Sequence, residues 1–388
     1  MRNLFSQLWD SSEEQFKEEA IKFLGSADPR ILSEWRRISI EITQKYYNNI
    51  ITYTTNLFIP LTVLCRNKCS YCGFSRSEPQ SDAEFLSIKK IKEELLKAQE
   101  YGLSEILITM GDKPELRYPN AQKWLENHGF HSTIEYTKFI ANSCLEENLL
   151  PHINAGSLSF SDYQQLKDVS ASMGLMLENT SSRFSEIGMP HHNSPDKYPE
   201  VRLQSLRDAG KLKIPFTTGL LIGIGESYQE IINSLVDIKR IFEKYGHIQE
   251  VIIQNFQPHP NSLMKNYPTV PLSLLEKIII LARIVLQPEI SIQIPPNLLT
   301  GSENRFINSG ISDWGGISPL TLDYINPNHK WPSIAYLAEI SAKSGKKMKE
   351  RLPIYPRYLN LGWISPQIRK VIMEQELSTE DGYRKRTQ

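Results

Sequence analysis

Cysteine is scarce in this chain, with four residues among 388, which excludes a fold held together by a framework of disulfides. Long apolar runs are also missing, since no segment approaches the roughly 20 consecutive apolar residues that span a bilayer. Charge of one sign is not in excess, because 44 Lys and Arg residues balance 44 Asp and Glu residues. This balance argues against a surface for nucleic acid or for an anionic membrane.

The N-terminal segment MRNLFSQLWDSSEEQF becomes acidic early and has no apolar core of the kind found in signal peptides. Three of the four cysteines lie within one short segment, a distribution typical of metal binding in a reducing compartment. We therefore expect a cytoplasmic protein.

The clustered cysteines are Cys65, Cys69 and Cys72, in the segment CRNKCSYC with the spacing C-x3-C-x2-C. Three thiolates leave one iron of a 4Fe-4S cluster open, whereas electron carriers normally use four. An open iron is what radical S-adenosylmethionine (SAM) enzymes need to bind SAM and cleave it to a 5'-deoxyadenosyl radical. The alternatives are a structural zinc site or an electron-carrying cluster, each of which normally takes four ligands. The one remaining cysteine is Cys144, which lies in a helical-looking stretch. The spacing therefore predicts one 4Fe-4S cluster held by these three cysteines, with SAM as cosubstrate.

Short β-rich runs alternate with amphipathic stretches of helical period along most of the chain. Strands are predicted at 57–64, 105–111, 150–156, 174–179, 216–225, 250–256, 291–297 and 314–321. Helices are predicted near 85–101, 134–147, 159–168, 200–212, 226–245, 271–287 and 302–309. This alternation predicts an α/β fold, a (β/α) barrel of TIM type with eight strands. We expect a helical extension over 1–50, the barrel over 51–350, and a C-terminal extension and tail over 351–388.

Active sites of such barrels lie at the carboxyl ends of the strands, and the cysteine segment follows the first predicted strand. Asp112 follows the second strand and could accept hydrogen bonds from the SAM ammonium, although a turn cap is the alternative. Glu178 ends the fourth strand and could hold the ribose hydroxyls, with Arg183 reaching the SAM carboxylate. The alternative for these two is a surface ion pair, which contributes little.

The fifth and sixth strands offer weaker candidates for the same cofactor. In the run GLLIGIGE, Gly219 and Gly223 would let an adenine or methionine group lie against the backbone, whereas Glu226 is expected to cap the following helix. In EVIIQNF, the backbone up to Asn255 could read the adenine edge.

Several longer segments carry a family resemblance. They are FIPLTVLCRNKCSYCGF, TMGDKPELRYPNAQKWLENHGF, LLPHINAG, VSASMGLMLE, GMPHHNSPDKYP, IPFTTGLLIGIGE, HIQEVIIQNF, IPPNL and DWGGISP. With these segments the chain resembles the 7,8-didemethyl-8-hydroxy-5-deazariboflavin synthases, specifically the CofG-type radical SAM subunit. The cysteine motif is shared by all radical SAM enzymes, whereas GDKPELRYP and the PHHNSPDK segment are more specific. One departure is Pro260-Asn261-Ser262, where the family usually has Pro-Gly-Thr.

The resemblance implies a lyase-type ring closure in deazaflavin coenzyme biosynthesis. The substrate would be 5-amino-5-(4-hydroxybenzyl)-6-(D-ribitylimino)-5,6-dihydrouracil, which cyclises by a radical route and loses ammonia. A separate partner subunit of CofH type would make this adduct, and a low-potential reductant would supply the electron. The alternative is another radical SAM barrel enzyme, biotin-synthase-like or of the menaquinone pathway, with the same cluster and SAM chemistry.

Polar residues near the predicted strand ends are candidates for contact with this substrate, which carries a ribityl chain, a uracil and a phenol. His192 and Asp196 are also candidates for proton transfer. The substrate candidates are His152, Asn154, His191, His192, Asp196 and Lys197.

Overall fold

The computed structural model describes residues 12–77, 85–299, 301–360 and 362–385. The strands are β1 (Ile50–Thr62), β2 (Glu105–Met110), β3 (Leu150–Asn154), β4 (Ser172–Gly174), β5 (Phe216–Ile222), β6 (Ile248–Asn255), β7 (Ser291–Gln293), β8 (Asp313–Ile317) and β9 (Lys347–Glu350). The α-helices are α2 (Glu13–Gly25), α3 (Pro29–Tyr47), α4 (Ile88–Glu100), α5 (Pro119–Asn127), α6 (Thr133–Glu146), α7 (Phe160–Leu166), α8 (Pro199–Lys211), α9 (Tyr228–Tyr245), α10 (Leu272–Val285), α11 (Glu303–Ile307), α12 (Ile334–Lys343) and α13 (Pro366–Glu374). Short 3-10 helices are η1 (Pro114–Leu116), η2 (Lys167–Val169), η3 (Ser182–Ser185), η4 (Pro195–Lys197), η5 (Pro296–Leu298) and η6 (Pro356–Tyr358).

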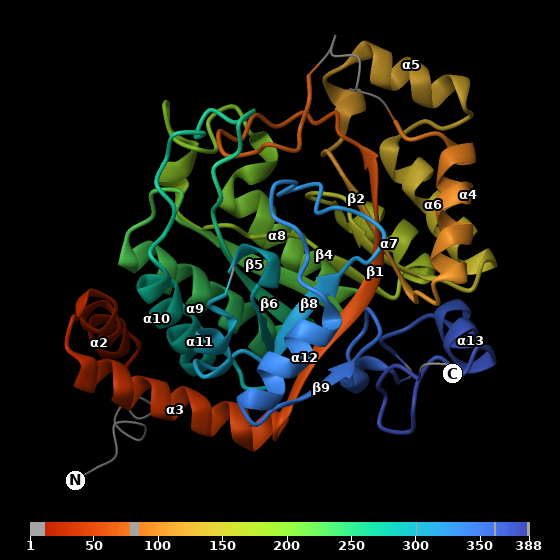
Figure 1. Cartoon of the computed structure of the whole chain (residues 1–388). Helices are drawn as coiled ribbons and strands as arrows, with labels where there is room; N and C mark the ends of the chain where they lie inside the picture. The colour runs from red at the N-terminus through yellow and green to blue at the C-terminus, as the bar shows by residue number, and fades with distance from the viewer. Residues whose placement is uncertain (1–11, 78–84, 300, 361, 386–388) are drawn as a thin grey trace.

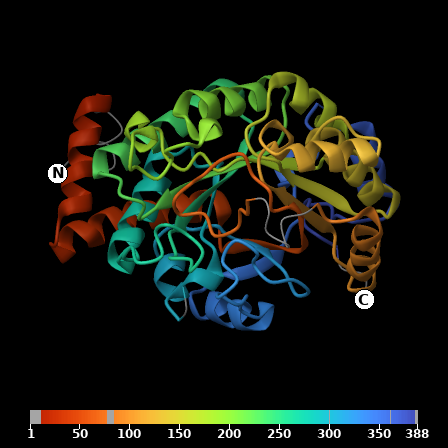
Figure 2. The same cartoon turned by 90° about the horizontal axis from the view of Figure 1, so that it is seen from above.

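Strands β1 to β8 form a closed parallel barrel at the centre of the molecule (Figure 1). Each strand pairs with the next one in the chain, and β1 pairs with both β2 and β8, which closes the ring. Figure 2, seen from above, shows helices along the outer side of the strands. The predicted (β/α) barrel of TIM type, with eight strands in the ring, is confirmed.

The outer helices begin and end at residues that satisfy their free backbone groups. Helix α9 starts with a capping box, in which Ser227 and Glu230 each accept a backbone hydrogen bond from the other, and it ends at Gly246 with a φ of 66°. Its buried face, which includes Ile231 and Leu235, packs toward the barrel. The helices predicted within 1–50 appear as α2 and α3, which are joined by a stacked pair of rings, Phe23 and Trp35, with centroids 4.3 Å apart.

Some boundaries differ from the prediction because polar side chains face the interior of the barrel. β1 begins at Ile50 rather than 57, and its early part includes the buried residues Thr54 and Asn56, which interrupt the apolar pattern. β4 ends at Gly174, and the predicted strand over 174–179 continues only as an isolated bridge from Glu178 to Leu220. Strand β9 and helices α5, α12 and α13 were not predicted.

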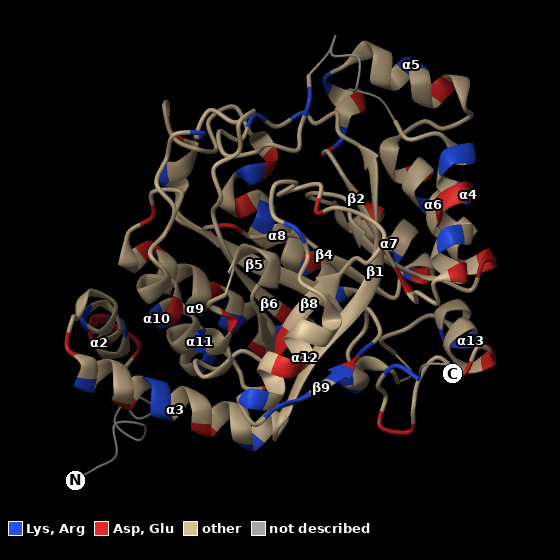
Figure 3. Cartoon of the chain, viewed as in Figure 1, with Lys and Arg blue, Asp and Glu red and all other residues tan. Residues whose placement is uncertain are grey.

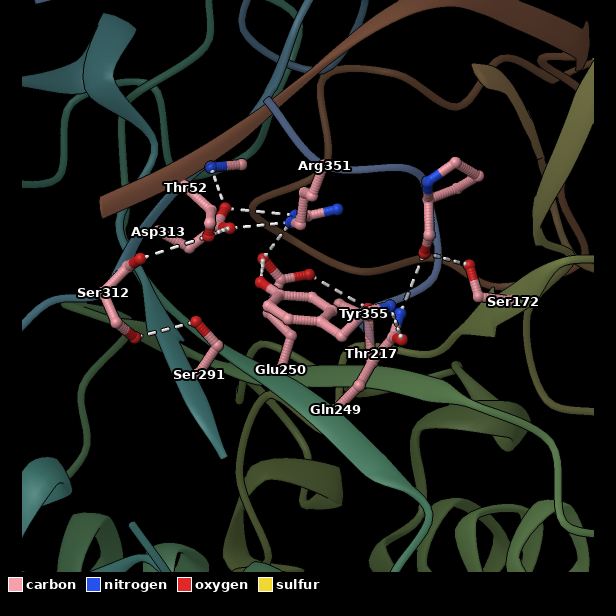
Figure 4. A network of polar contacts seen from close by, with 12 residues as sticks. Thr52, Ser172, Thr217, Gln249, Glu250, Ser291, Ser312, Asp313, Arg351 and Tyr355 are labelled. Carbon is pink, nitrogen blue, oxygen red and sulfur yellow. Dashed lines mark hydrogen bonds and ion pairs between the residues drawn. The ribbon is translucent and has the colours of Figure 1, made fainter. Parts of the chain in front are cut away.

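The chain after β9 closes the amino-terminal end of the barrel, which we call the floor. Arg351 is 3% exposed, and its guanidinium donates to Asp313 on β8 (Nε to Oδ2, 2.7 Å) and to Glu250 on β6 (3.1 Å). The Tyr355 hydroxyl also donates to Glu250, at 3.2 Å. Figure 4 shows this network from close by. Residues 351–355 therefore pack as part of the barrel, while the domain boundary at residue 350 stays a prediction.

Charges of both signs are mixed on the outside of the barrel. In Figure 3, Lys and Arg alternate with Asp and Glu along α3 and α4, in line with the equal numbers of the two charge types in the whole sequence. Among the described helices, we find none with the length and apolar character required to cross a membrane.

Candidate active site

A single cavity of about 370 Å³ runs inside the barrel from the carboxyl ends of the strands, which we call the mouth, to the floor. At the mouth it is lined by the three clustered cysteines, Asp112 and Glu178, and at the floor by Glu250 and Arg351. The volume lies in the range of small-molecule sites. The part of the cavity between the two ends, which we call the lumen, is lined by Thr54, Asn56, Glu105, Leu107, His152, Thr217 and Gln293.

The loop after β1 brings Cys65, Cys69 and Cys72 to the mouth, where all three are partly exposed and line the cavity. Backbone hydrogen bonds hold this loop in place, including Arg66 N–H to Asp112 O (3.0 Å) and Ser70 N–H to Pro190 O (2.8 Å). Cys144, by contrast, is fully buried in α6. The fold thus separates the fourth cysteine from the other three, as the sequence spacing indicates.

Two of the three thiols, Cys65 and Cys69, lie in a setting that favours their protonated form until a metal binds. Burial, with the nearby charge of Asp112, raises the pKa of Cys65 to about 12, and burial also raises the pKa of Cys69. Backbone N–H groups are aimed at two sulfurs: Asp112 N–H donates to Cys65 Sγ (3.2 Å) and Ser75 N–H to Cys72 Sγ (3.4 Å). Such donors stabilise a thiolate that a metal has deprotonated.

In the described part of the chain, no three His, Cys, Asp or Glu side chains come close enough together to hold one metal ion. A structural zinc ion normally takes four ligands, one more than the three thiols of this loop provide. A 4Fe-4S cluster can take one thiolate on each of three irons and keep its fourth iron open. The donor set at the mouth, three thiols on one ordered loop, fits such a cluster.

Asp112 is a buried carboxylate with one oxygen left open. It follows β2 and is 3% exposed; its Oδ2 accepts a hydrogen bond from Ser157 N–H (3.0 Å), and its Oδ1 has no partner among the described residues. Burial raises its pKa to about 6, and the neighbouring charge of Asp196 adds to the shift. It does not cap the following element, because the N-cap of η1 is Lys113. The open oxygen suits a cationic ligand at the mouth.

Glycines allow the loops of the mouth to approach one another closely. A Cβ on Gly111 would lie 1.9 Å from Leu64 O, and one on Gly156 would lie 2.4 Å from Asp112 Oδ2. The cysteine loop and Asp112 can therefore meet only because these two positions carry no side chain.

Glu178 also lines the cavity, at the mouth end, with a left-handed backbone (φ 65°). Its Oε1 accepts from Lys197 Nζ at 2.6 Å, and the Lys197 ammonium lies 5.6 Å from the centre of the Tyr71 ring. The Tyr71 hydroxyl is within hydrogen-bond distance of His191 Nε2 (3.1 Å). Burial lowers the pKa of His191 to about 2, so its imidazole is neutral. The predicted residues Glu178, Lys197 and His191 thus form one connected group beside the cysteine loop.

Other predicted site residues lie elsewhere. Arg183 pairs with Glu230 at the start of α9, with nitrogen–oxygen distances of 2.9 and 2.7 Å. His192 lines a separate surface hollow together with Arg117 and Tyr198. Asp196 is buried and bound by the guanidinium of Arg66, next to Cys65 in the chain. Arg183 and Asp196 therefore have structural partners within the protein. His192 lies outside the main cavity.

The candidates from β5 and β6 contribute to packing. A Cβ on Gly219 would lie 2.4 Å from Ile252 O, so the glycine permits close strand pairing. Gly223 has a φ of 102°, which a residue with a side chain rarely adopts. Asn255 Nδ2 donates to Leu298 O at 3.3 Å. None of these three is among the described residues that line the cavity. Two substrate candidates from β3, His152 and Asn154, do line it.

Sequence reasoning missed most of the polar groups deeper in the cavity, chiefly Thr54, Asn56 and Glu105 in the lumen and Glu250 and Arg351 at the floor. The available signal was the alternation of Thr54, Asn56 and Phe58 in β1, because residues two apart in a strand face the same side. Glu105 is the first residue of β2, and a charged residue at the start of a strand is easily interpreted as lying in solvent.

The chain is similar to known proteins in sequence and in fold. Residues 59–238 match the model of the Radical SAM superfamily. A 7,8-didemethyl-8-hydroxy-5-deazariboflavin synthase of Methanopyrus kandleri is 43% identical over 335 residues, which cover 86% of this chain and 99% of the relative. An FO synthase of Streptomyces avermitilis is 46% identical over 327 residues, which cover 82% of this chain but 38% of that longer protein. Among solved structures, the FeFe-hydrogenase maturase HydG from Carboxydothermus hydrogenoformans superposes with a TM-score of 0.71 at 19% identity, covering 95% of this chain and 81% of that one.

Proposed function

The chain belongs to the 7,8-didemethyl-8-hydroxy-5-deazariboflavin synthase family of radical SAM enzymes, and we propose that it carries out the ring closure of that synthesis as an ammonia-releasing lyase. Its role as a radical SAM enzyme of deazaflavin synthesis follows from the family. The substrate that we propose is 5-amino-5-(4-hydroxybenzyl)-6-(D-ribitylimino)-5,6-dihydrouracil. The proposal rests mainly on one observation. A continuous cavity connects the three cysteine thiols at the mouth to the polar lumen below them.

The radical SAM family uses a 4Fe-4S cluster and SAM, and the residues at the mouth fit both. We propose that Cys65, Cys69 and Cys72 hold the cluster, that Asp112 accepts hydrogen bonds from the SAM ammonium, and that Glu178 takes the ribose hydroxyls. When bound, these groups supply the 5'-deoxyadenosyl radical that removes a hydrogen atom from the substrate. The buried and partly unpartnered state of Asp112 supports its role, because an open carboxylate oxygen without a ligand is costly.

The remaining residues at the mouth position these groups and keep water out. Arg66 and Asp196 form a partly buried ion pair directly beside Cys65, and we propose that this pair anchors the cysteine loop and does not carry protons. Lys197 sets the orientation of Glu178 through their 2.6 Å contact. The predicted contact of His152 and Asn154 with substrate remains part of the proposal, since both line the cavity.

We propose further that a separate CofH-type subunit supplies the hydroxybenzyl adduct. The chain spans 38% of the length of the FO synthase of Streptomyces avermitilis, which leaves room in that protein for a second catalytic unit. The Methanopyrus kandleri relative matches this chain over 99% of its own length, as a stand-alone subunit would.

The test is anaerobic reconstitution of the protein with iron and sulfide, followed by reaction with SAM, a reductant and the purified adduct. We expect 5'-deoxyadenosine, ammonia and a fluorescent deazaflavin in equal amounts. SAM cleavage without deazaflavin would identify another radical SAM enzyme, and absence of SAM cleavage in a protein that has its cluster would overturn the proposal altogether.

A further inference from the structure

Two buried carboxylates that line the cavity, one in the lumen and one at the floor, lie in contrasting surroundings. Glu250, on β6, accepts hydrogen bonds from Arg351, Tyr355 and Thr217, at 3.1, 3.2 and 3.0 Å. Glu105, on β2, is just as deeply buried, but its Oε1 has only the long contact of 3.4 Å from Asn56 Nδ2. Its Oε2 has no hydrogen-bond partner within the described structure. Glu105 therefore carries an open acceptor on the wall of the cavity.

Thr54 lies on the neighbouring strand, close to this carboxylate. Its hydroxyl is buried and has no hydrogen-bond partner among the residues described. Burial raises the pKa of Glu105, while the charge of Arg351 and the nearby Thr54 hydroxyl both oppose that rise. Buried polar groups are nearly always satisfied in folded proteins. Two such groups on adjacent strands, both facing the cavity, indicate a ligand that completes their hydrogen bonds.

His152, on β3, supplies a third acceptor, and its tautomer follows from its neighbours. The Ser172 hydroxyl has one proton, which it donates to Pro353 O at 2.7 Å. Ser172 must therefore accept from His152 Nδ1, 2.7 Å away, so Nδ1 carries the proton and Nε2 is bare. Burial lowers the pKa of His152 to about 3, which keeps the ring neutral. A chain of contacts from the floor thus fixes His152 with an acceptor on the cavity side.

These three residues lie on three consecutive strands at nearby levels. Asn56 of β1 is paired with Glu105 of β2, and Leu107 of β2 is paired with His152 of β3. Glu105 and His152 are therefore diagonal neighbours on the inner face of the barrel, which places them within reach of one extended ligand. Because acceptors outnumber donors in this group, the ligand must bring several donors of its own.

We propose that this part of the lumen is a polyol subsite, in which Glu105, Thr54 and His152 bind the hydroxyl groups of the ribityl chain. The inference rests on the proposed function, because the ring-closure substrate carries such a chain. A ribityl group offers a hydroxyl on successive carbons, each of which donates one hydrogen bond and accepts others. The reacting part of the substrate must remain at the mouth, near Asp112 and Glu178, so the unreactive chain occupies the deeper and more polar lumen.

The test compares two ligands on the wild type and on Glu105→Gln, which keeps the shape of the side chain and removes its charge. The ligands are the ribityl adduct and an analogue with a methyl group in place of the ribityl chain. Dissociation constants are measured by equilibrium dialysis with the reconstituted, SAM-loaded enzyme. We expect Glu105→Gln to weaken binding of the ribityl adduct by about tenfold or more, the loss typical of a charged hydrogen-bond partner. Binding of the methyl analogue should change less than twofold.

Two further variants complete the test, one as a folding control and one as a second probe of the subsite. Glu303→Gln neutralises another buried carboxylate, on α11 outside the cavity, and should alter neither dissociation constant. Thr54→Val preserves side-chain shape and should weaken the ribityl adduct selectively but less than Glu105→Gln. Equal losses for both ligands, or no loss for either, in Glu105→Gln and Thr54→Val would overturn the subsite. Wild type that binds the ribityl adduct but forms no deazaflavin would instead overturn the proposed function.

Discussion

The buried charged groups at the two ends of the barrel differ in how fully the protein itself provides their hydrogen bonds. At the floor, Arg351 lies between Asp313 and Glu250, and the hydrogen-bonding capacity of these groups is used within the protein. At the mouth, Asp112 keeps an open oxygen and three thiols face the cavity. Since an unsatisfied buried polar group costs about 1–3 kcal/mol, the unpaired oxygen of Asp112 makes the mouth less stable without a ligand than with one. The floor therefore serves folding, and the mouth serves binding.

The largest effect expected at the mouth is loss of the cluster. Replacing Cys65, Cys69 or Cys72 with Ala should abolish both the absorbance of the cluster and SAM cleavage after anaerobic reconstitution. Cys144→Ala is the matched control, because this thiol is buried in α6, and it should retain both properties. Loss of the cluster in the Cys144 variant would contradict the assignment.

The largest effect expected at the floor is on stability. Arg351→Met leaves Asp313 and Glu250 buried without their cation, and removing one partner of a buried ion pair typically costs about 3–5 kcal/mol. Urea unfolding followed by fluorescence and by circular dichroism measures the loss. Arg183→Met makes the same change in a more exposed Arg–Glu pair and should cost less than about 1 kcal/mol. Similar losses in both variants would remove the distinction between floor and surface.

Removing the charge of Asp112 should affect binding more than stability. In Asp112→Asn, SAM affinity should fall by about 1.5–3 kcal/mol, which corresponds to roughly ten- to a hundredfold, while cluster absorbance is retained. Isothermal titration of the reconstituted protein with SAM gives the affinity. An unchanged dissociation constant would mean that Asp112 only supports the Ser157 loop.

The floor side should also show a pH dependence through His247, which precedes β6 and is fully buried. Burial lowers its pKa from 6.5 to about 3, so the unfolded chain binds a proton below pH 6.5 while the folded chain does not. Its contribution to stability is therefore lost as pH falls from 6.5 toward 3, by about 1.4 kcal/mol per pH unit. His247→Phe should lack this component, so the stability difference between variant and wild type should shift toward the variant between pH 6 and pH 4. A constant difference over that range would show that His247 does not titrate in this way.

The smallest effect is expected for Arg183 as a candidate SAM ligand. Because its guanidinium is engaged by Glu230 and Gly225 O outside the cavity lining, Arg183→Ala should change SAM affinity by less than about twofold. A tenfold loss in the same titration used for Asp112 would show that the side chain turns to the mouth when SAM binds.

Most of the fold and the position of the cysteine loop could be read from local sequence patterns. Cysteine spacing and strand–helix alternation depend on residues that are close in the chain, and both predictions agree with the barrel and with the family. Asp112 and Glu178 could be placed because they follow strands that end at one rim. Arg183 and His192 could not, since a residue's distance from a strand end does not reveal whether its side chain turns to the cavity or away from it.

The sequence by itself determined the cysteine loop, the eight-stranded ring and most of the outer helices, because hydrophobic periodicity and motif spacing are local properties. Only the tertiary structure decided which charges meet. Arg351 reaches Glu250 across about a hundred residues, and Asp196 meets Arg66 across a similar separation. The unpaired oxygen of Glu105 and the unpaired hydroxyl of Thr54 are also a result of the tertiary structure. Closure of the ring turns both side chains toward the shared interior of the barrel. Such pairings depend on the register of strands around the whole barrel, which no local pattern of residues specifies.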